Sequence, residues 1–496
     1  MRGSEKRFLG TSYRTIWRSR TRPDPRLFSA QNIRAETETC RNELYRPKKD
    51  LCDIQLVMQR SDFQTTILPL IRREFPRADA DVNGRRRVFF ENAAGSLVLQ
   101  RAADAEARAR VDCSANVDGP SWESKRNEEV ILEGRQAVSD LLNAPNADCI
   151  VSGESATSLL FHLSYAIARQ LSGKENVVTT DYEHYANVNP WLELEQRGLI
   201  EEVRFARFNP KNGLLDLSHL ESLIDENTRV ISVAGVSNVL GSKTPLDQVL
   251  RIAKGAPAYT VLDAVHTVAH VPFDVQRTPF DFVVFSAYKL FSRRGSFMCG
   301  RKDLLQSLKP YKVLPAPEEP PSNWEMGTRD QSLFASMTAV IEYLSWLGRE
   351  VEQQVGGMVD AYTGRRRLLK AALAWIEDYE RGLSVAMLEG TQGVEGLSRL
   401  AGIETYGVTD PAQVHLRVPT FTFNILDADP FDVAEYLWEK HAIAVLAEDH
   451  GGFYSRTLKT YGKSIAVRAS PVHFNTVEEI GAFLRGLRDA VRHFSS

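Results

Sequence analysis

The chain has 496 residues, of which 43% are hydrophobic and 25% charged, the composition of an ordinary globular protein with room for two or three domains. A formal net charge of −3 gives no reason to expect nucleic acid as a partner, and no apolar run approaches the ~20 residues that span a bilayer. The five cysteines are scattered without C-x-x-C spacing, so the sequence indicates neither a zinc site nor a disulfide framework. A cytoplasmic, reducing compartment is therefore expected.

The amino-terminal part differs in composition from the rest of the chain. Residues 1–34 are rich in arginine and poor in acids, and they lack the apolar segment of a secretory signal. We expect residues 1–57 to be a basic, disordered tail, with an organelle transit segment as the alternative. Met58 is a further candidate for the true start of the chain.

From residue 58 onward the pattern is that of an α/β protein. Residues 58–87 are predicted to form an N-terminal helical arm, with an amphipathic helix over 63–75. A large domain is expected over 88–330, because apolar β runs alternate there with helical stretches, which favours a mostly parallel sheet. These β runs are 148–151, 176–180, 229–236, 259–263, 280–286 and 295–299.

A Pro-rich stretch at 315–321 marks the boundary to a smaller α+β domain over 331–496. Apolar residues at helical spacing over 333–347 predict a long helix at the start of this domain. Strands are predicted at 413–425 and 464–470, and a closing helix near 477–493.

Two of the β runs end at or near ionisable side chains of the kind that enzymes use in catalysis. Lys289 follows the run Phe282–Ser286, and Asp263 ends the run that begins at Tyr259. An amine and a carboxylate at the carboxyl ends of two strands both open into the ligand crevice of an α/β sheet. Pyridoxal phosphate (PLP) needs this pair, since the amine forms a Schiff base with its aldehyde and the acid keeps its pyridine nitrogen protonated.

There are plainer interpretations of each motif. A lysine after a strand is more often a solvated strand end, and Ser286-x-x-Lys289 also matches a β-lactamase pattern whose partner tripeptides do not occur here. Ser155 and Thr157 follow a strand and a Gly turn at a helix start, where they form either a phosphate cradle or ordinary caps. His184 follows another strand, placed either to stack on a flat cofactor or simply at the surface.

Taken together and in order, these segments resemble the class-V aminotransferase family of PLP enzymes, in particular its cysteine-desulfurase-like and isopenicillin N epimerase-like group. The resemblance covers roughly residues 63–490 and implies PLP-dependent transferase fold type I. In this fold a large domain with a mostly parallel seven-stranded sheet is followed by a smaller α+β C-terminal domain. The motifs that carry the resemblance are Glu91–Gly95, Glu183–Asn187, Ser237–Gly241, Asp263–His266, Ser286–Lys289, Glu325–Thr328 and Arg468–Ser470.

The resemblance implies a role for each matching residue. Lys289 is the Schiff-base lysine that also moves the Cα proton, Asp263 pairs with the pyridine nitrogen, and His184 stacks on the ring. The other cofactor contacts implied are His266 at the ring oxygen, Ala156, Thr157 and Ser286 at the phosphate, and Asn238. No metal is implied.

The resemblance also implies substrate and subunit contacts. Arg468 corresponds to the residue that clamps the substrate carboxylate, with Asn238, Ala94, His450 and Tyr454 as further substrate contacts. Gly327 and Thr328 match the segment that reaches a neighbouring subunit's phosphate, which implies a homodimer with shared active sites.

Two departures from the family pattern affect the expected reaction. Cysteine desulfurases carry a nucleophilic cysteine on a loop before the arginine strand, whereas here that region, 447–456, has none and no cysteine follows Cys299. Cys299 itself lies in a strand run and is expected to be a packed apolar residue. Tyr288 stands where many relatives have a histidine that contacts the phosphate.

We therefore expect a PLP enzyme that acts at or near Cα of an α-amino acid. A lyase that cleaves a C–S or C–C bond is favoured, and an aminotransferase, an epimerase and a cysteine desulfurase are the alternatives within the family. A non-catalytic PLP-binding regulatory protein is the alternative of another class, disfavoured because a scaffold would not need Asp263, Lys289 and Arg468 together.

Overall fold

The computed structural model describes residues 61–449 and 455–495. The predicted tail over 1–57 and the predicted substrate contacts His450 and Tyr454 lie outside these described residues. The described chain belongs to one unit, Arg60–Ser496. The division of this unit at residue 330 stays a prediction.

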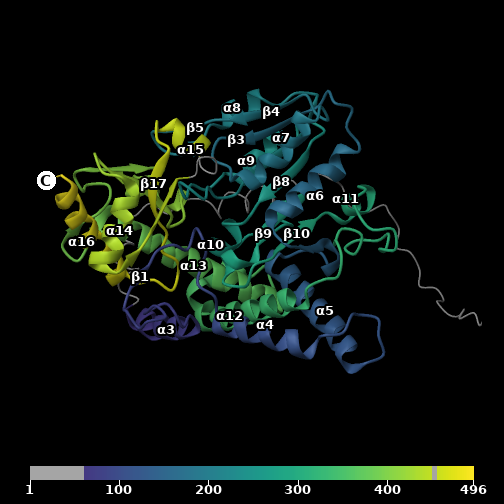
Figure 1. Ribbon diagram of the computed structural model, residues 1–496, viewed down its shortest axis with the longest axis horizontal. Helices are drawn as coiled ribbons and strands as arrows, with labels where there is room; N and C mark the ends of the chain where they lie inside the picture. The colour runs from purple at the N-terminus through teal and green to yellow at the C-terminus, as the bar shows by residue number, and fades with distance from the viewer. Residues whose placement is uncertain (1–60, 450–454, 496) are drawn as a thin grey trace, which may run out of the picture. The chain divides into compact units, whose positions relative to one another are not determined.

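A seven-stranded sheet dominates the described chain (Figure 1). Its strand order is β2-β10-β9-β8-β7-β3-β4, in which β10 is antiparallel to both neighbours and the strands from β9 to β4 are parallel. The predicted α/β class with a mostly parallel sheet is confirmed. The bounds are β2 (Ile150–Gly153), β10 (Ser296–Gly300), β9 (Phe282–Ser286), β8 (Tyr259–Asp263), β7 (Thr228–Ala234), β3 (Asn176–Thr180) and β4 (Glu202–Ala206).

The central strands of this sheet are largely apolar because helices cover both faces. Along β9 the side chains of Phe282 and Val284 join one hydrophobic cluster, and those of Val283 and Phe285 join another. Figure 1 shows α4, α5 and α12 side by side on one side of the sheet. The helices are α3 (Ser61–Glu74), α4 (Gln100–Asp112), α5 (Trp122–Leu142), α6 (Ala156–Ala168), α7 (Asn189–Gln196), α8 (Leu217–Ser222), α9 (Leu246–Ala253), α10 (Thr267–His270), α11 (Lys302–Ser307), α12 (Gln331–Val355), α13 (Gly364–Glu389), α14 (Pro430–His441), α15 (Ser455–Thr460) and α16 (Val477–Phe494).

A second, antiparallel sheet of four strands forms with the C-terminal helices the predicted α+β part. Its order is β13-β14-β17-β16, and α14 and α16 pack beside it. A short parallel pair, β1 with β15, joins residues 88–89 to residues 443–444. The bounds are β1 (Val88–Phe89), β13 (Ile403–Tyr406), β14 (Phe421–Ile425), β15 (Ile443–Ala444), β16 (Leu446–Asp449) and β17 (Ile465–Ala469), with further two-residue strands at β5 (Phe208–Asn209), β6 (Leu214–Leu215), β11 (Gly390–Thr391) and β12 (Val394–Glu395).

The strand predicted over 413–425 is wrong in its first half. Residues Pro411–Leu416 form a 3₁₀ turn, and β14 begins only at Phe421. The turn is favoured locally because Pro411 occupies its first position and the Asp410 carboxylate accepts the Ala412 N–H at 2.9 Å.

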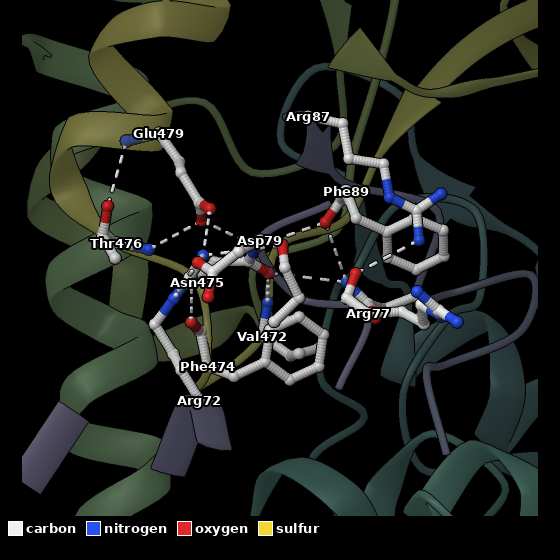
Figure 2. Close-up of polar contacts among 12 residues, drawn as sticks. Arg72, Arg77, Asp79, Arg87, Phe89, Val472, Phe474, Asn475, Thr476 and Glu479 are labelled. Atoms are coloured by element: carbon white, nitrogen blue, oxygen red, sulfur yellow. Dashed lines mark hydrogen bonds and ion pairs between the residues drawn. The ribbon is translucent and has the colours of Figure 1, made fainter. Parts of the chain in front are cut away.

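Helix α3 is tied to the C-terminal part by a polar cluster, here called the Arg72 cluster: Arg72, Asp79, Asn475 and Glu479 (Figure 2). The Arg72 guanidinium donates to the Phe474 carbonyl at 2.6 Å and to Glu479 at 2.9 Å. Asn475 donates to Glu479 at 2.9 Å and to the Phe89 carbonyl at 3.2 Å. The cluster therefore joins α3, β1 and the start of α16.

Candidate active site

The predicted site residues gather at one edge of the large sheet. Because β3, β7, β8 and β9 are parallel, their carboxyl ends meet at this edge. Asp263 is the last residue of β8, and Lys289, Asn238 and His184 follow β9, β7 and β3 within four residues. The register of the sheet thus brings together residues that lie more than a hundred positions apart in the chain.

Lys289 is half-buried on the short 3₁₀ turn after β9, with its amine surrounded by protein groups. Its Nζ donates to the Ala94 carbonyl at 2.9 Å and also to the Ala93 carbonyl, so the predicted contact Ala94 lies beside it. Burial, reinforced by the nearby Arg468 charge, lowers the pKa of Lys289 to about 7, against the opposing effects of Glu448 and Asp263. Near neutral pH a large share of this amine is unprotonated and nucleophilic.

Asp263 and His266 lie on the segment that follows β8. The Asp263 carboxylate accepts the Val265 N–H at 2.9 Å, and burial raises its pKa to about 6, although Lys289 opposes the shift. Burial, together with the Lys289, His270, Arg468 and His184 charges, holds the pKa of His266 well below its ordinary value. His266 is therefore a neutral imidazole within electrostatic reach of Lys289, His184 and Arg468.

His184 is followed in the chain by the amide that holds its ring and preceded by the buried carboxyl of Glu183, which was not among the predicted site residues. His184 Nδ1 accepts the Ala186 N–H at 3.0 Å, which fixes the ring. Next to it, Glu183 accepts hydrogen bonds from Thr180 Oγ1 at 2.6 Å, the Ala234 N–H at 2.9 Å and Asn187 Nδ2 at 2.8 Å. Burial raises the pKa of Glu183 to about 7, and the neighbouring Asp263 charge adds to the shift.

The predicted phosphate contacts occupy the start of α6 and the end of β9. Ser155 caps α6 through a reciprocal pair with Ser158, so Ala156 and Thr157 are the first residues of the helix. Their backbone amides belong to the first turn, which has no intrahelical acceptors and favours anions. Ser286 is buried at the end of β9, and its hydroxyl lies 3.1 Å from that of Ser296.

Arg468 lies on β17, and its guanidinium is near Asn238, Glu448 and Lys289. Nη1 donates to the Asn238 carbonyl at 2.8 Å, and Nη2 lies 3.5 Å from Glu448 Oε2. Glu448 was not among the predicted site residues, because its place beside Arg468 depends on the pairing of β16 with β17. Arg468 and Glu448 are also electrostatic neighbours of Lys289, as the direction of each effect on its pKa shows.

The structure leaves Gly327 and Thr328 exposed at the surface. The segment before them is anchored by Glu325, whose buried carboxylate binds Arg135 at 2.8 and 3.0 Å and the Ser152 hydroxyl at 2.7 Å. Gly327 adopts φ +77°, in the left-handed region that favours glycine. The predicted contact of this pair with a second subunit stays a prediction.

A second layer of buried polar groups lies behind His266. The His266 and His270 rings are parallel with centroids 6.4 Å apart, and His270 Nδ1 lies 2.7 Å from Glu380 Oε2. Glu380 also accepts the His473 N–H at 3.1 Å. No spacing in the sequence indicates this set, since it joins α10 to α13 and to the loop after β17.

Comparisons with known proteins agree with this geometry. Residues 88–365 match the family described as class-V aminotransferase. The match spans more than half of the chain, and the chain belongs to this family.

Among curated proteins, the cysteine desulfurase of Pectobacterium atrosepticum is 27% identical over 434 residues, which cover 84% of this chain and 96% of that protein. That of Serratia proteamaculans is 28% identical over 437 residues, covering 84% and 97%. A probable cysteine desulfurase of Streptomyces coelicolor is 26% identical over 447 residues, covering 86% and 97%. These relatives match the chain over most of their own length.

Solved structures share the fold. The cysteine desulfurase CsdA of Escherichia coli, in an S-sulfonic acid form, superposes with a TM-score of 0.70 at 21% identity, covering 86% of this chain and 98% of that one. An apo cysteine desulfurase of Thermococcus onnurineus also gives 0.70 at 24% identity, covering 82% and 95%. PLP-dependent transferase fold type I is confirmed.

The chain is thus a PLP enzyme of the class-V aminotransferase type, as its motifs predicted, and the alternative of a non-catalytic PLP-binding protein is set aside. In the part of the chain that the structure describes, no helix is long and apolar enough to cross a bilayer.

The residues at the sheet edge fit PLP chemically. Lys289 offers a buried amine with a lowered pKa, the state that attacks an aldehyde. Asp263 offers a buried carboxyl whose pKa is raised by burial, and a protonated pyridine nitrogen beside it would favour its charged form. The first-turn amides of α6 suit a phosphate.

Proposed function

We propose that this protein is a PLP-dependent lyase that cleaves a C–S or C–C bond of an α-amino acid at or near Cα, without the help of an enzyme thiol. The observation that carries this proposal is the grouping of Lys289 with Asp263 and Arg468 at one sheet edge, next to a strand β16 that carries Glu448. No cysteine follows Cys299 in the chain.

Each residue of the proposed site has a task that its surroundings support. When bound, PLP supplies an electron sink for negative charge that develops at Cα. Lys289 binds the cofactor and then takes or returns the Cα proton, for which a pKa of about 7 is well suited. Asp263 holds the proton on the pyridine nitrogen, and His184, fixed by the Ala186 amide, lies against the ring.

The remaining residues orient the ligands. Arg468 binds the substrate carboxylate with Asn238 and Ala94 beside it, and the outer substrate contacts His450 and Tyr454 belong to the same proposal. Ala156, Thr157 and Ser286 hold the phosphate. His266 is neutral and offers a hydrogen bond to the ring oxygen.

Two further parts of the proposal concern the whole protein. We propose a homodimer in which Gly327 and Thr328 of one subunit reach the phosphate of the other, since both residues are exposed and their segment is anchored by Glu325. A cytoplasmic location is part of the same proposal. Sedimentation of the purified protein tests the dimer, and a monomer with full activity would contradict it.

A cysteine desulfurase is the second candidate, because the curated relatives named above carry that name. The three described cysteines, Cys113, Cys149 and Cys299, are buried, and burial raises the pKa of each thiol. A raised pKa leaves little thiolate to attack sulfur. Cys40 and Cys52 lie outside the described residues.

Product analysis separates the candidates. The holoenzyme is incubated with a panel of amino acids and S-substituted cysteines, and released thiol, keto acid, ammonia and inverted amino acid are measured. A C–S lyase releases thiol, keto acid and ammonia in equal amounts. An aminotransferase needs a second keto acid to accept the amino group, and an epimerase changes only configuration. Arg468→Ala should raise KM for the true substrate sharply.

Cys299→Ala distinguishes lyase from desulfurase. We expect this variant to lose some stability through a small cavity but to keep its turnover, because Cys299 packs within the sheet. Sulfide release from cysteine that disappeared in the Cys299→Ala variant, or in a variant of Cys40 or Cys52, would overturn the lyase proposal in favour of the desulfurase.

A further inference from the structure

Glu448 forms an ion pair with Arg468, the arginine that the proposed function assigns to the substrate carboxylate. Strands β16 and β17 are antiparallel, with Leu446 opposite Arg468 and Glu448 opposite Ala466. Residues opposite each other and two positions along share a face, so Glu448 and Arg468 are diagonal neighbours. Their charged groups lie 3.5 Å apart, and both side chains are largely buried, Arg468 with 5% and Glu448 with 19% exposed.

A second carboxyl lies in the same neighbourhood. Glu91 pairs through its backbone with Ser470, two residues after Arg468. Burial raises the pKa of Glu91, Arg87 and Arg468 oppose that shift, and the Glu448 charge adds to it. Glu91 and Glu448 are therefore within electrostatic reach of one another and of the same guanidinium.

The two acids near Arg468 affect which substrates can bind there. An α-carboxylate that binds Arg468 adds a negative charge beside Glu448, which already pairs with this guanidinium, and within electrostatic reach of Glu91. Like charges disfavour one another strongly at a site with little water. A positive charge on the substrate's own side chain removes this penalty, because it can pair with Glu448 while Arg468 turns to the carboxylate.

We propose that Glu448 is a specificity-determining residue that selects amino acids with a cationic side chain. This proposal rests on the proposed function, because it assumes that Arg468 binds the substrate carboxylate. It adds a substrate class to the proposed function. In this role Glu448 does not contact the reacting atoms. It discriminates between substrates by the charge of their side chains.

The test uses two thioethers of equal length that differ in one charge. S-(2-aminoethyl)-L-cysteine carries an ammonium group where S-propyl-L-cysteine carries a methyl group. Dissociation constants for both are measured on the holoenzyme from the change in cofactor absorbance, and kcat/KM from thiol release. We expect the cationic compound to bind about tenfold more tightly, the factor that one charge-assisted contact supplies.

Glu448→Gln keeps the size of the side chain and removes its charge. In this variant we expect the ratio of the two dissociation constants to fall to about one, with tighter binding of the neutral compound. Glu439→Gln, which changes an exposed acid on α14, is the matched control and should keep the ratio of the original protein. Circular dichroism and cofactor content verify that both variants fold.

The possible failures are distinguishable. A ratio of dissociation constants near one in the original protein, or an unchanged ratio in Glu448→Gln, overturns the selection by Glu448. Cleavage of either compound in that case still supports the lyase proposal. If neither compound nor any amino acid of the panel changes the absorbance of the PLP-loaded protein, the proposed function fails, and this inference fails with it.

Discussion

Two polar regions of this molecule, the partly buried Arg72 cluster and the sheet edge, satisfy their charges in different ways. In the Arg72 cluster each charged group meets an opposite charge or several donors, as Figure 2 shows for Arg72 and Glu479. At the sheet edge, Lys289 donates to backbone carbonyls and Asp263 accepts from a backbone amide. The pKa of Lys289 is lowered to about 7 and that of Asp263 raised to about 6.

This contrast teaches which region stabilises and which reacts. Paired and fully hydrogen-bonded charges hold segments together, whereas buried groups with strongly shifted pKa values gather at sites of chemistry.

Lys289→Ala should lower turnover by about 10³-fold or more, since the amine both binds the cofactor and moves the proton. Lys370 gives a matched comparison, because its amine also donates to backbone carbonyls and also has a pKa lowered to about 7. Borohydride reduction of the holoenzyme followed by peptide mass spectrometry should find the cofactor on Lys289. A label on Lys370 instead would refute the assignment of the site.

Asp263→Asn should lower turnover roughly 10²-fold while PLP remains bound, since the change removes the charge that keeps the ring nitrogen protonated. The cofactor content and the absorbance spectrum of the variant separate this effect from loss of PLP. Turnover equal to that of the original protein would remove Asp263 from the site.

Arg72→Ala should lower the free energy of unfolding by about 3 kcal/mol, because it leaves Glu479 without its ionic partner. Urea unfolding measures this loss. The kcat/KM of the folded variant should stay within about twofold of the original, as no site residue is changed. A selective loss of activity at unchanged stability would contradict the purely stabilising role of the Arg72 cluster.

Glu183→Gln should flatten the dependence of apoenzyme stability on pH. The pKa of Glu183 is about 7 in the fold and 4.5 ordinarily, so the native state binds its proton more tightly than the unfolded state does. The stabilisation is complete below pH 4.5 and is lost as the pH rises to about 7, a change of ~3 kcal/mol. Urea unfolding at several pH values measures it, and equal slopes in both proteins would contradict the raised pKa.

The sequence predicts the sheet edge well because strand ends are local features. Apolar runs that stop at Asp263 and shortly before Lys289 show where two strands end, and the parallel arrangement follows from the alternation with helices. Strand β4 was not predicted, because its residues are only partly buried and include Glu202 and Arg204, so they do not form an apolar run.

Other features could not be predicted because they depend on register or on distant pairing. Glu448 meets Arg468 only through the pairing of β16 with β17, and His270 meets Glu380 across 110 positions of the chain. Glu183 is visible in the sequence next to His184, but its three donors come from segments up to 51 positions away.

The hydrogen bonds of Lys289 also bear on the order in which the molecule can assemble. Its amine is bound by carbonyls 195 and 196 positions earlier, and the Ala93 amide in turn donates to Ser470 Oγ, 377 positions later. During synthesis the loop at Ala93 emerges long before Ser470, so it must wait for one of the last strands before it takes its native form. Contacts of such long range form late in folding. A protein that binds PLP in its native manner has thus already completed its C-terminal sheet, and the yellow colour of the cofactor would report that this sheet has formed.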